Sequence, residues 1–377
     1  MRTKKRRSEH EGRRTAPAPA VGRVHSDQGL SRRQWLTGVT ALAATAMVPG
    51  REAAAQAGAA RPYRIDTHHH HSQGGPWTPS KAIEGMDHTG IATAILSRPG
   101  IPVSEPDKAR KLARDTNEFA AQVARDHPGR FGVFASLPLF DVEGSLREIA
   151  YGVDVLKADG VCLVTSYSGP SFGNKWVGDP AFAPVFDELN RRKAVVFIHP
   201  TVPMYYNADF RLENGSVSGV SGVNQTALEN QFDTARAIVS LIINGTLVRC
   251  PDIRFIFCHG GGVLPTLHER LDHLIGQDQP ARTDGGSDGG YRSKYVPNGF
   301  DREMRKLYFD IVRVANPANF AMLTKLMPPE RLLFGTDYPP VPISETASHM
   351  PSLHLDGKVL RGIERDNALT LFPRFKA

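Results

Sequence analysis

Residues 194–199 read Ala-Val-Val-Phe-Ile-His and are followed by a proline, and this stretch carries the pattern that decides the fold. An unbroken apolar run rich in β-branched residues is typical of a strand buried on both faces, as strands are in parallel sheets. The run ends on a polar side chain, His199, at the carboxyl end of the strand. The stretch therefore predicts a core strand with one histidine at its edge.

Seven other segments repeat this design of a short apolar run bounded by glycine, proline or a polar residue. Strands alternating with amphipathic helical stretches pair in parallel through right-handed crossovers. Eight such units in about 300 residues predict an α/β fold of the (β/α)8 TIM-barrel type. The eight predicted strands are Tyr63–Thr67, Ile91–Ser97, Arg130–Leu137, Gly160–Ser166, Ala194–His199, Ile253–His259, Leu307–Val312 and Arg331–Asp337. The predicted helices between them include Asp107–His127, Val142–Lys157, Ala181–Arg192, Thr226–Arg249 and Pro317–Lys325.

A doubly wound sheet is the competing architecture. It needs about six strands, and it usually carries a glycine-rich phosphate loop after the first of them. The first strand here has no such loop, and the glycines at 260–262 lack the required spacing. They are typical of a tight turn between a strand and a helix, so the barrel is favoured.

The first predicted strand closes on the sequence Asp-Thr-His-His-His-His at residues 66–71. Side chains alternate along an extended chain, so His68 and His70 share one face while His69 points away. Two neutral imidazoles on one face are a metal-ligand pair. A histidine run by itself is a weak signal, because such runs also occur as surface tracts.

Three further polar residues end other predicted strands: His199 the fifth, His259 the sixth and Asp337 the eighth. A lone histidine at such a position is usually a satisfied core or surface residue. The carboxyl ends of barrel strands, however, meet at one mouth, so these side chains are expected to converge with the histidines of the first strand. The sequence therefore predicts a metal centre at the C-terminal mouth of the barrel.

These residues resemble the amidohydrolase superfamily, and within it the amidohydrolase-2 branch typified by aminocarboxymuconate-semialdehyde decarboxylase. The similarity extends over about residues 64–375. Besides the histidines and the aspartate it rests on Met86–Ile91, Asp252–Gly262, Arg331–Pro339 and Asn367–Phe372.

The resemblance implies that His68, His70, His199 and Asp337 bind one divalent metal. Zinc is favoured, with manganese or iron as alternatives, and His259 would be an acid/base that does not bind the metal. Members with two metals carry a bridging lysine or acid at the end of the fourth strand. Here that strand ends Val-Thr-Ser-Tyr at residues 164–167, so we expect a mononuclear site.

Decarboxylation and hydrolysis are both open to such a metal centre. The resemblance favours a metal-dependent, non-oxidative decarboxylase of a small aromatic or unsaturated carboxylic acid, above all an ortho-hydroxybenzoate of the 6-methylsalicylate kind. The alternatives are a mononuclear hydrolase or hydratase of a lactone, amide or enol acid, and a non-catalytic metal-binding protein. In the decarboxylase, Asp337 would be catalytic together with His259.

Two residues are predicted to line the substrate pocket. Trp77 follows the histidine run and would form the floor beneath a ring, although a core position is equally consistent with the sequence. Arg98 follows the second strand and would pair with a substrate carboxylate through its planar guanidinium.

We expect three parts of the chain: a leader at residues 1–55, a linker at 56–62 and one barrel domain at 63–377. Two connections within the barrel exceed ordinary loop lengths. Thr201–Gln225 follows the fifth strand at the mouth and is expected to cover the substrate. Gln277–Gly299 is expected to be an insertion that contacts a neighbouring subunit, and the resemblance implies a homodimer.

The positive charge of the chain is concentrated at its N-terminus. The first 55 residues contain eleven Lys or Arg and four Asp or Glu, a surplus of seven that equals the net charge of +7 of the whole chain. The rest of the chain therefore has no net charge, which argues against a nucleic-acid partner. Three cysteines are too few for a disulfide framework.

The leader also resembles an export signal. Arg32 and Arg33 precede a short uncharged stretch, Gln34–Gly50, and the small-residue run Ala53–Ala55 follows. This order is typical of a secretory signal, and the paired arginines make it similar to twin-arginine (Tat) signals. The alternative is an ordinary N-terminal helix. The signal implies export to the periplasm or beyond through the Tat translocon after folding in the cytoplasm, without a stable membrane anchor.

Overall fold

The computed structural model describes residues 63–73, 75–101, 105–169, 173–201, 218–220, 223–276 and 295–376. The predicted leader and linker, and most of the two long connections, lie outside the described residues. Among the helices that the structure describes, none combines the length and the apolar character that a membrane crossing requires.

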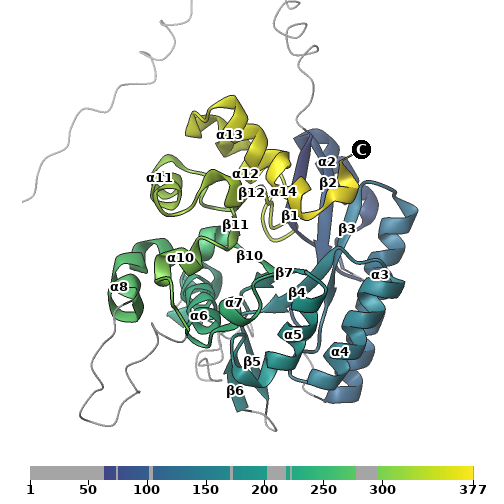
Figure 1. The fold of residues 1–377 in the computed structure, drawn as a ribbon. Coiled ribbons are helices and arrows are strands. Elements are labelled where there is room, and N and C mark those ends of the chain that lie inside the picture. The colour runs from purple at the N-terminus through teal and green to yellow at the C-terminus, as the bar shows by residue number, and fades with distance from the viewer. Residues whose placement is uncertain are drawn as a thin grey trace, which may run out of the picture. The chain divides into compact units, whose positions relative to one another are not determined.

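A parallel sheet of eight strands forms the centre of the described part (Figure 1). Neighbours in the sheet follow chain order, so the sheet winds in one direction about its axis. Its strands are β1 (Arg64–His70), β2 (Ile91–Ser97), β3 (Phe131–Ser136), β4 (Gly160–Val164), β7 (Val195–His199), β10 (Arg254–Phe257), β11 (Tyr308–Asp310) and β12 (Leu332–Leu333). All eight predicted strands are present, with ends that differ by a few residues.

Backbone hydrogen bonds close the sheet between its first and last strands. The amide of Thr67 donates to the carbonyl of Phe334 at 3.0 Å, and the amide of His70 donates to the carbonyl of Tyr338 at 2.8 Å. These bonds bring the first and last strands together into a nearly closed sheet, which confirms the predicted (β/α)8 barrel.

Helices follow the strands and cover the outside of the sheet, as Figure 1 shows for α3, α4 and α5 beside β3 and β4. The helix α3 turns an alanine-rich face, with Ala109, Ala113 and Ala120 buried, towards the sheet. The main helices are α2 (Pro79–Thr89), α3 (Pro106–Asp126), α4 (Val142–Ala150), α5 (Ala183–Arg191), α6 (Glu229–Ile243), α7 (Thr246–Arg249), α8 (Leu264–Gly276), α10 (Phe300–Met304), α11 (Pro317–Leu326), α12 (Glu345–His349), α13 (Gly357–Arg361) and α14 (Asn367–Leu371).

Two hairpins were not predicted. One pairs β5 (Ser166–Gly169) with β6 (Gly173–Trp176), directly after β4. The other pairs β8 (Ser218–Val220) with β9 (Val223–Asn224), within the connection that we expected to cover the substrate. Both follow the carboxyl ends of barrel strands, which is where loops form the functional face of this fold.

Side chains from all eight strands fill the interior of the barrel. One buried cluster contains Ile65, Ile95, Phe134, Cys162, Phe197, Ile256, Tyr308 and Leu333, and residues of the C-terminal helix α14 complete it at the amino end. The rings of Phe134 and Phe197 stack with centroids 5.4 Å apart. Packed side chains therefore fill the amino end of the barrel and stabilise the fold. The polar residues stand at the carboxyl ends of the strands, where the functional residues of this fold are found.

The two ends of the described barrel lie side by side. The hydroxyl of Tyr63 donates to the carbonyl of Phe375 at 3.3 Å, and Arg64 forms an ion pair with Glu364 at 2.6 Å. The C-terminal segment is thus fastened to the start of β1, on the side of the sheet where the strands begin.

Candidate metal centre

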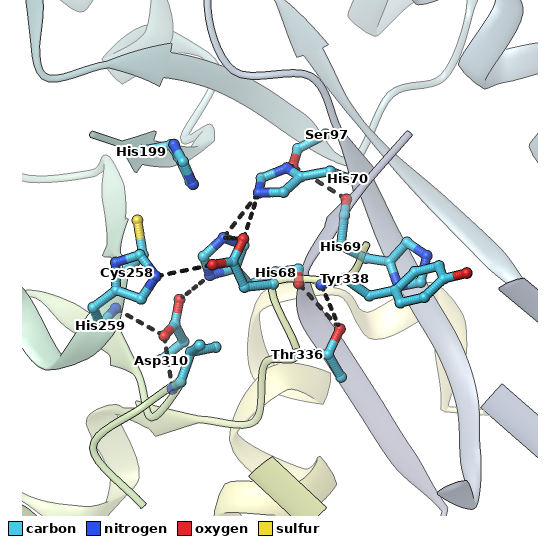
Figure 2. A network of polar contacts seen from close by, with 12 residues as sticks. His68, His69, His70, Ser97, His199, Cys258, His259, Asp310, Thr336 and Tyr338 are labelled. Atoms are coloured by element: carbon cyan, nitrogen blue, oxygen red, sulfur yellow. Dashed lines mark hydrogen bonds and ion pairs between the residues drawn. The ribbon is translucent and has the colours of Figure 1, made fainter. Parts of the chain in front are cut away.

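The strand β1 continues to His70, three residues beyond the predicted strand, so that the histidines lie on the strand itself. Its pleat turns His68 and His70 to the same side, with their Nε2 atoms 3.1 Å apart (Figure 2). His69 points the other way, where its Nδ1 lies 3.0 Å from Asp66 Oδ2 and its Nε2 accepts a hydrogen bond from Trp77. The predicted alternation along the strand is therefore present.

His199 and Asp337 complete this group from the ends of β7 and β12. One ligand atom of each of His68, His70, His199 and Asp337 lies within 4.8 Å of all the others. Asp337 Oδ1 is 3.2 Å from His68 Nε2 and 3.0 Å from His70 Nε2. His199 Nε2 is buried and has no hydrogen-bond partner among the described residues. A buried nitrogen without a partner, beside three other donor atoms, fits a bound cation.

The charge states of these groups suit metal binding. Burial lowers the pKa of His70, and it lowers the pKa of His199 well below the ordinary value, so both rings are neutral and keep a lone pair. Burial by itself would raise the pKa of Asp337, but His68, His259 and His70 hold it well below its usual range.

The surroundings of the His68 ring favour a positive charge. Burial alone would lower the pKa of His68, but the carboxylates of Asp337 and Asp310 raise it to about 10. The field of these carboxylates therefore attracts a cation to His68 Nε2, and a divalent metal satisfies that demand in place of a proton.

A second layer of side chains orients the ligand rings. His68 Nδ1 lies 2.8 Å from Asp310 Oδ2, and His70 Nδ1 lies 3.0 Å from Ser97 Oγ (Figure 2). Partners of this kind fix the tautomer and the orientation of a metal-binding imidazole. Sequence reasoning missed both residues. A charged residue at the end of the predicted strand Leu307–Val312 was the available signal for Asp310.

His259 stands beside the four ligand candidates and contacts the other oxygen of Asp337. Its Nε2 lies 3.2 Å from Asp337 Oδ2, while its backbone amide donates to Asp310 Oδ1 at 2.9 Å. The ring thus lies where an acid/base is expected. Its role stays a prediction, as do the roles of the four ligand candidates.

A cavity of about 380 Å³ opens beside this group. His70, His199, His259 and Asp337 line it together with Arg313. The volume suits a small aromatic acid, whose polar groups would meet the donors at one wall.

Neither predicted substrate residue lines this cavity. Trp77 is only 3 % exposed and packs its ring near Phe119 and Phe131, behind β1. Arg98 lies near His71, whose pKa burial and the charge of Arg98 lower to about 3. Instead the neighbouring Pro99 reaches the cavity wall. The pleat accounts for Arg98, since the preceding Ser97 faces His70 and the next side chain turns to the other side.

Arg313 was not predicted, although it directly follows the seventh predicted strand. Its backbone has φ +57°, in the left-handed region that residues other than glycine seldom adopt. His259 with φ +55° and Asp337 with φ +57° share this conformation. The rule that found the polar ends of the fifth, sixth and eighth strands would have found Arg313 at the seventh.

Comparisons with known proteins agree with this fold. The family model described as Amidohydrolase matches residues 65–374. The decarboxylase yanB of Aspergillus niger is 34% identical over 83% of this chain and 88% of its own length. The 6-methylsalicylic acid decarboxylase acuB of Aspergillus aculeatus is 34% identical over 83% of this chain and 97% of its own length.

A solved structure shares the fold at lower identity. The dihydroxybenzoic acid decarboxylase from Polaromonas, with bound manganese and the inhibitor 2-nitroresorcinol, superposes with a TM-score of 0.70 at 19% identity. The alignment covers 84% of this chain and 98% of that one. The family model matches most of this chain, and both relatives are more than 30% identical over more than two thirds of it. The chain therefore belongs to the amidohydrolase family.

Proposed function

We propose that this protein is a metal-dependent, non-oxidative decarboxylase of ortho-hydroxybenzoic acids of the 6-methylsalicylate kind. The observation that carries the proposal is the convergence of His68, His70, His199 and Asp337 into one group of possible metal ligands, beside a cavity whose volume suits a small ring. The names of the relatives supply the reaction class, because the donor set alone serves hydrolysis as well.

The reaction exchanges a carbon–carboxylate bond for a carbon–hydrogen bond, so the ring carbon gains one proton as CO2 leaves. His68, His70, His199 and Asp337 would hold the divalent metal, which would act as a Lewis acid towards negative charge on substrate oxygens. His259 Nε2 and Asp337 Oδ2, 3.2 Å apart at the cavity wall, form the pair that holds and delivers the proton.

The first experiment incubates metal-replete protein with 6-methylsalicylate and measures CO2 and 3-methylphenol. In D2O the product is expected to carry one deuterium at the carbon that bore the carboxylate. Salicylate and 2,6-dihydroxybenzoate extend the panel, and 3- and 4-hydroxybenzoate are the matched controls without an ortho hydroxyl.

His259→Ala separates the reaction classes. We expect decarboxylation to fall by a factor of about 100 or more while the metal content stays unchanged, since an acid/base contributes on this scale. The exposed His88→Ala is the control. No CO2 from any acid, together with turnover of lactones or amides, would replace the proposal with a hydrolase.

We also propose a single metal per chain, with zinc or manganese as the native ion. The described end of β4 offers no lysine or acid between Val164 and Tyr167, and the manganese in the Polaromonas enzyme makes that ion the first alternative to zinc. Metal analysis of the protein as purified, followed by reconstitution with each ion, tests both points. A content near two per chain would refute the mononuclear site.

The leader and the assembly remain proposals of the same kind. We propose that the leader sends the folded protein through the Tat translocon, and that the barrel forms a homodimer. Replacing both Arg32 and Arg33 by lysine should retain the protein inside the cell, as fractionation would show. Light scattering of the purified protein tests the dimer.

A further inference from the structure

The cavity beside the metal centre adjoins a second cavity of about 320 Å³. The two share the side chains of Thr226, Gln231, His259 and Arg313 as a common wall. Among the described residues that line either cavity, Arg313 is the only lysine or arginine. The one carboxylate on these walls, Asp337, is already engaged by His68, His70 and His259.

The backbone places Arg313 in the same structural series as the residues of the centre. His259, Arg313 and Asp337 follow the successive strands β10, β11 and β12, and all three have φ between +55° and +57°. A left-handed conformation is unfavourable for a non-glycine residue, and such outliers gather at functional sites. His259 and Asp337 line the cavity at the metal centre, and the turn after β11 places Arg313 on the wall of the same cavity.

The guanidinium of Arg313 retains capacity to bind an anion. It lies 3.5 Å from Glu345 Oε1 through its Nε, and its side chain is 58% exposed. A guanidinium carries five donors in a planar fork that matches the two oxygens of a carboxylate. The contact with Glu345 is made through Nε, at one edge of the fork.

We infer that Arg313 binds the carboxylate of the aromatic acid substrate and sets the preference of the cavity for anions. This inference rests on the proposed decarboxylase function. Because the carboxylate becomes neutral CO2 in the reaction, the pairing with Arg313 weakens as the transition state forms. Arg313 therefore contributes to binding rather than to the chemical step, and its loss raises KM without lowering kcat.

Calorimetry on metal-replete protein tests this with two probes of the same shape. The probes are 2-methylbenzoate, which is an anion and lacks the ortho hydroxyl, and the neutral 2-methylbenzamide. We expect Arg313→Gln to weaken binding of the anion about tenfold or more and binding of the amide less than threefold. With 6-methylsalicylate, KM rises by a similar factor and kcat changes less than threefold.

Two further variants guard against a purely structural effect. Arg313→Gly also removes the guanidinium but suits the left-handed turn, so its Tm is expected to equal or exceed that of the wild type while anion binding is lost. Arg191→Gln removes an equally exposed arginine, with 66% side-chain exposure on α5, and should change neither probe.

Each outcome bears on the inference. Unchanged affinity for 2-methylbenzoate in both Arg313 variants overturns it, as does failure of the wild type to bind that anion, even if decarboxylation is observed. Conversely, Arg313-dependent anion binding in a protein that decarboxylates no acid supports the inference and refutes the proposed function. A fall in kcat with unchanged KM and unchanged anion affinity also overturns it.

Discussion

The two sides of the barrel present their functional side chains in different ways. On β1 the pleat of a seven-residue strand turns His68 and His70 towards the centre. The strands β10, β11 and β12 span four, three and two residues, and the functional residues stand in left-handed turns beyond them. A candidate ligand within a strand is oriented by the alternation of side chains, whereas a candidate ligand beyond a strand depends on the geometry of a turn.

The largest expected effect comes from removing one ligand on either side. His70→Val on the strand and Asp337→Asn in the turn should both lose the metal and at least about 1,000-fold in activity, because each residue offers a donor atom to the same group of four. Asparagine is chosen since it tolerates the left-handed conformation. Metal analysis and initial rates provide the measurement. One full equivalent of metal in either variant would show that one side suffices.

The seam that joins the two sides is the set of hydrogen bonds made by Asp66. It should be the next most sensitive feature. Asp66 Oδ1 accepts from the amides of His68 and Thr336, and Asp66 Oδ2 contacts His69 Nδ1 and the Thr336 hydroxyl. Asp66→Ala leaves these buried donors without a partner and should lower the free energy of unfolding by about 3–5 kcal/mol. Asp66→Asn, which retains an acceptor oxygen, should lose less. Urea denaturation compares the two, and equal stabilities would disprove the role of this seam.

We expect the free energy of unfolding to depend on pH through Asp233 of α6. Its carboxylate accepts a hydrogen bond from Thr165, just after β4. Burial raises the pKa of Asp233 from 3.8 to about 6. The folded state therefore binds the proton more tightly than the unfolded state, and this residue lowers stability as the pH rises from about 4 to 6. The shift corresponds to about 3 kcal/mol.

Asp233→Asn should remove this dependence. Relative to the wild type, the variant is expected to gain about 2–3 kcal/mol in the free energy of unfolding between pH 4 and pH 7. Denaturation curves at several pH values provide the measurement. A constant difference between the two proteins across this range would rule out a raised pKa for Asp233.

The smallest expected effect compares the backbone of the strand β1 directly with that of the turn after β12. In metal-free protein, His70→Val places a β-branched residue in a strand, which such residues favour. Asp337→Val places the same residue in a left-handed turn, where it should cost about 1–2 kcal/mol more. Thermal and urea unfolding of the two apo variants measures this difference. Equal losses would mean that the turn imposes no backbone requirement.

The sequence predicts the regular side of the molecule well because burial and alternation are local patterns. The eight apolar runs, and the facing pair His68 and His70, follow from residue order alone. His199 and Asp337 could be proposed because the barrel rule brings strand ends together.

The irregular side was harder to predict. Asp310 contacts His68 and His259 through hydrogen bonds, and the turn after β11 places Arg313 on the cavity wall. Conversely, Trp77 and Arg98 lie close to the ligands in sequence but turn away from the cavity in space. Closeness to the ligand candidates along the chain therefore did not predict which side chains line the cavity.

The hydrogen bond between Tyr63 and Phe375 has a consequence for engineering. Because the two ends of the barrel meet on the side away from the cavity, a short linker should join them in a circular permutant. New termini at Gly129 would suit this design, since a Cβ added there meets no atom within 4 Å. Such a protein would begin with β3 and still bring every ligand strand to the same mouth, so strand order in space can be separated from strand order in the gene.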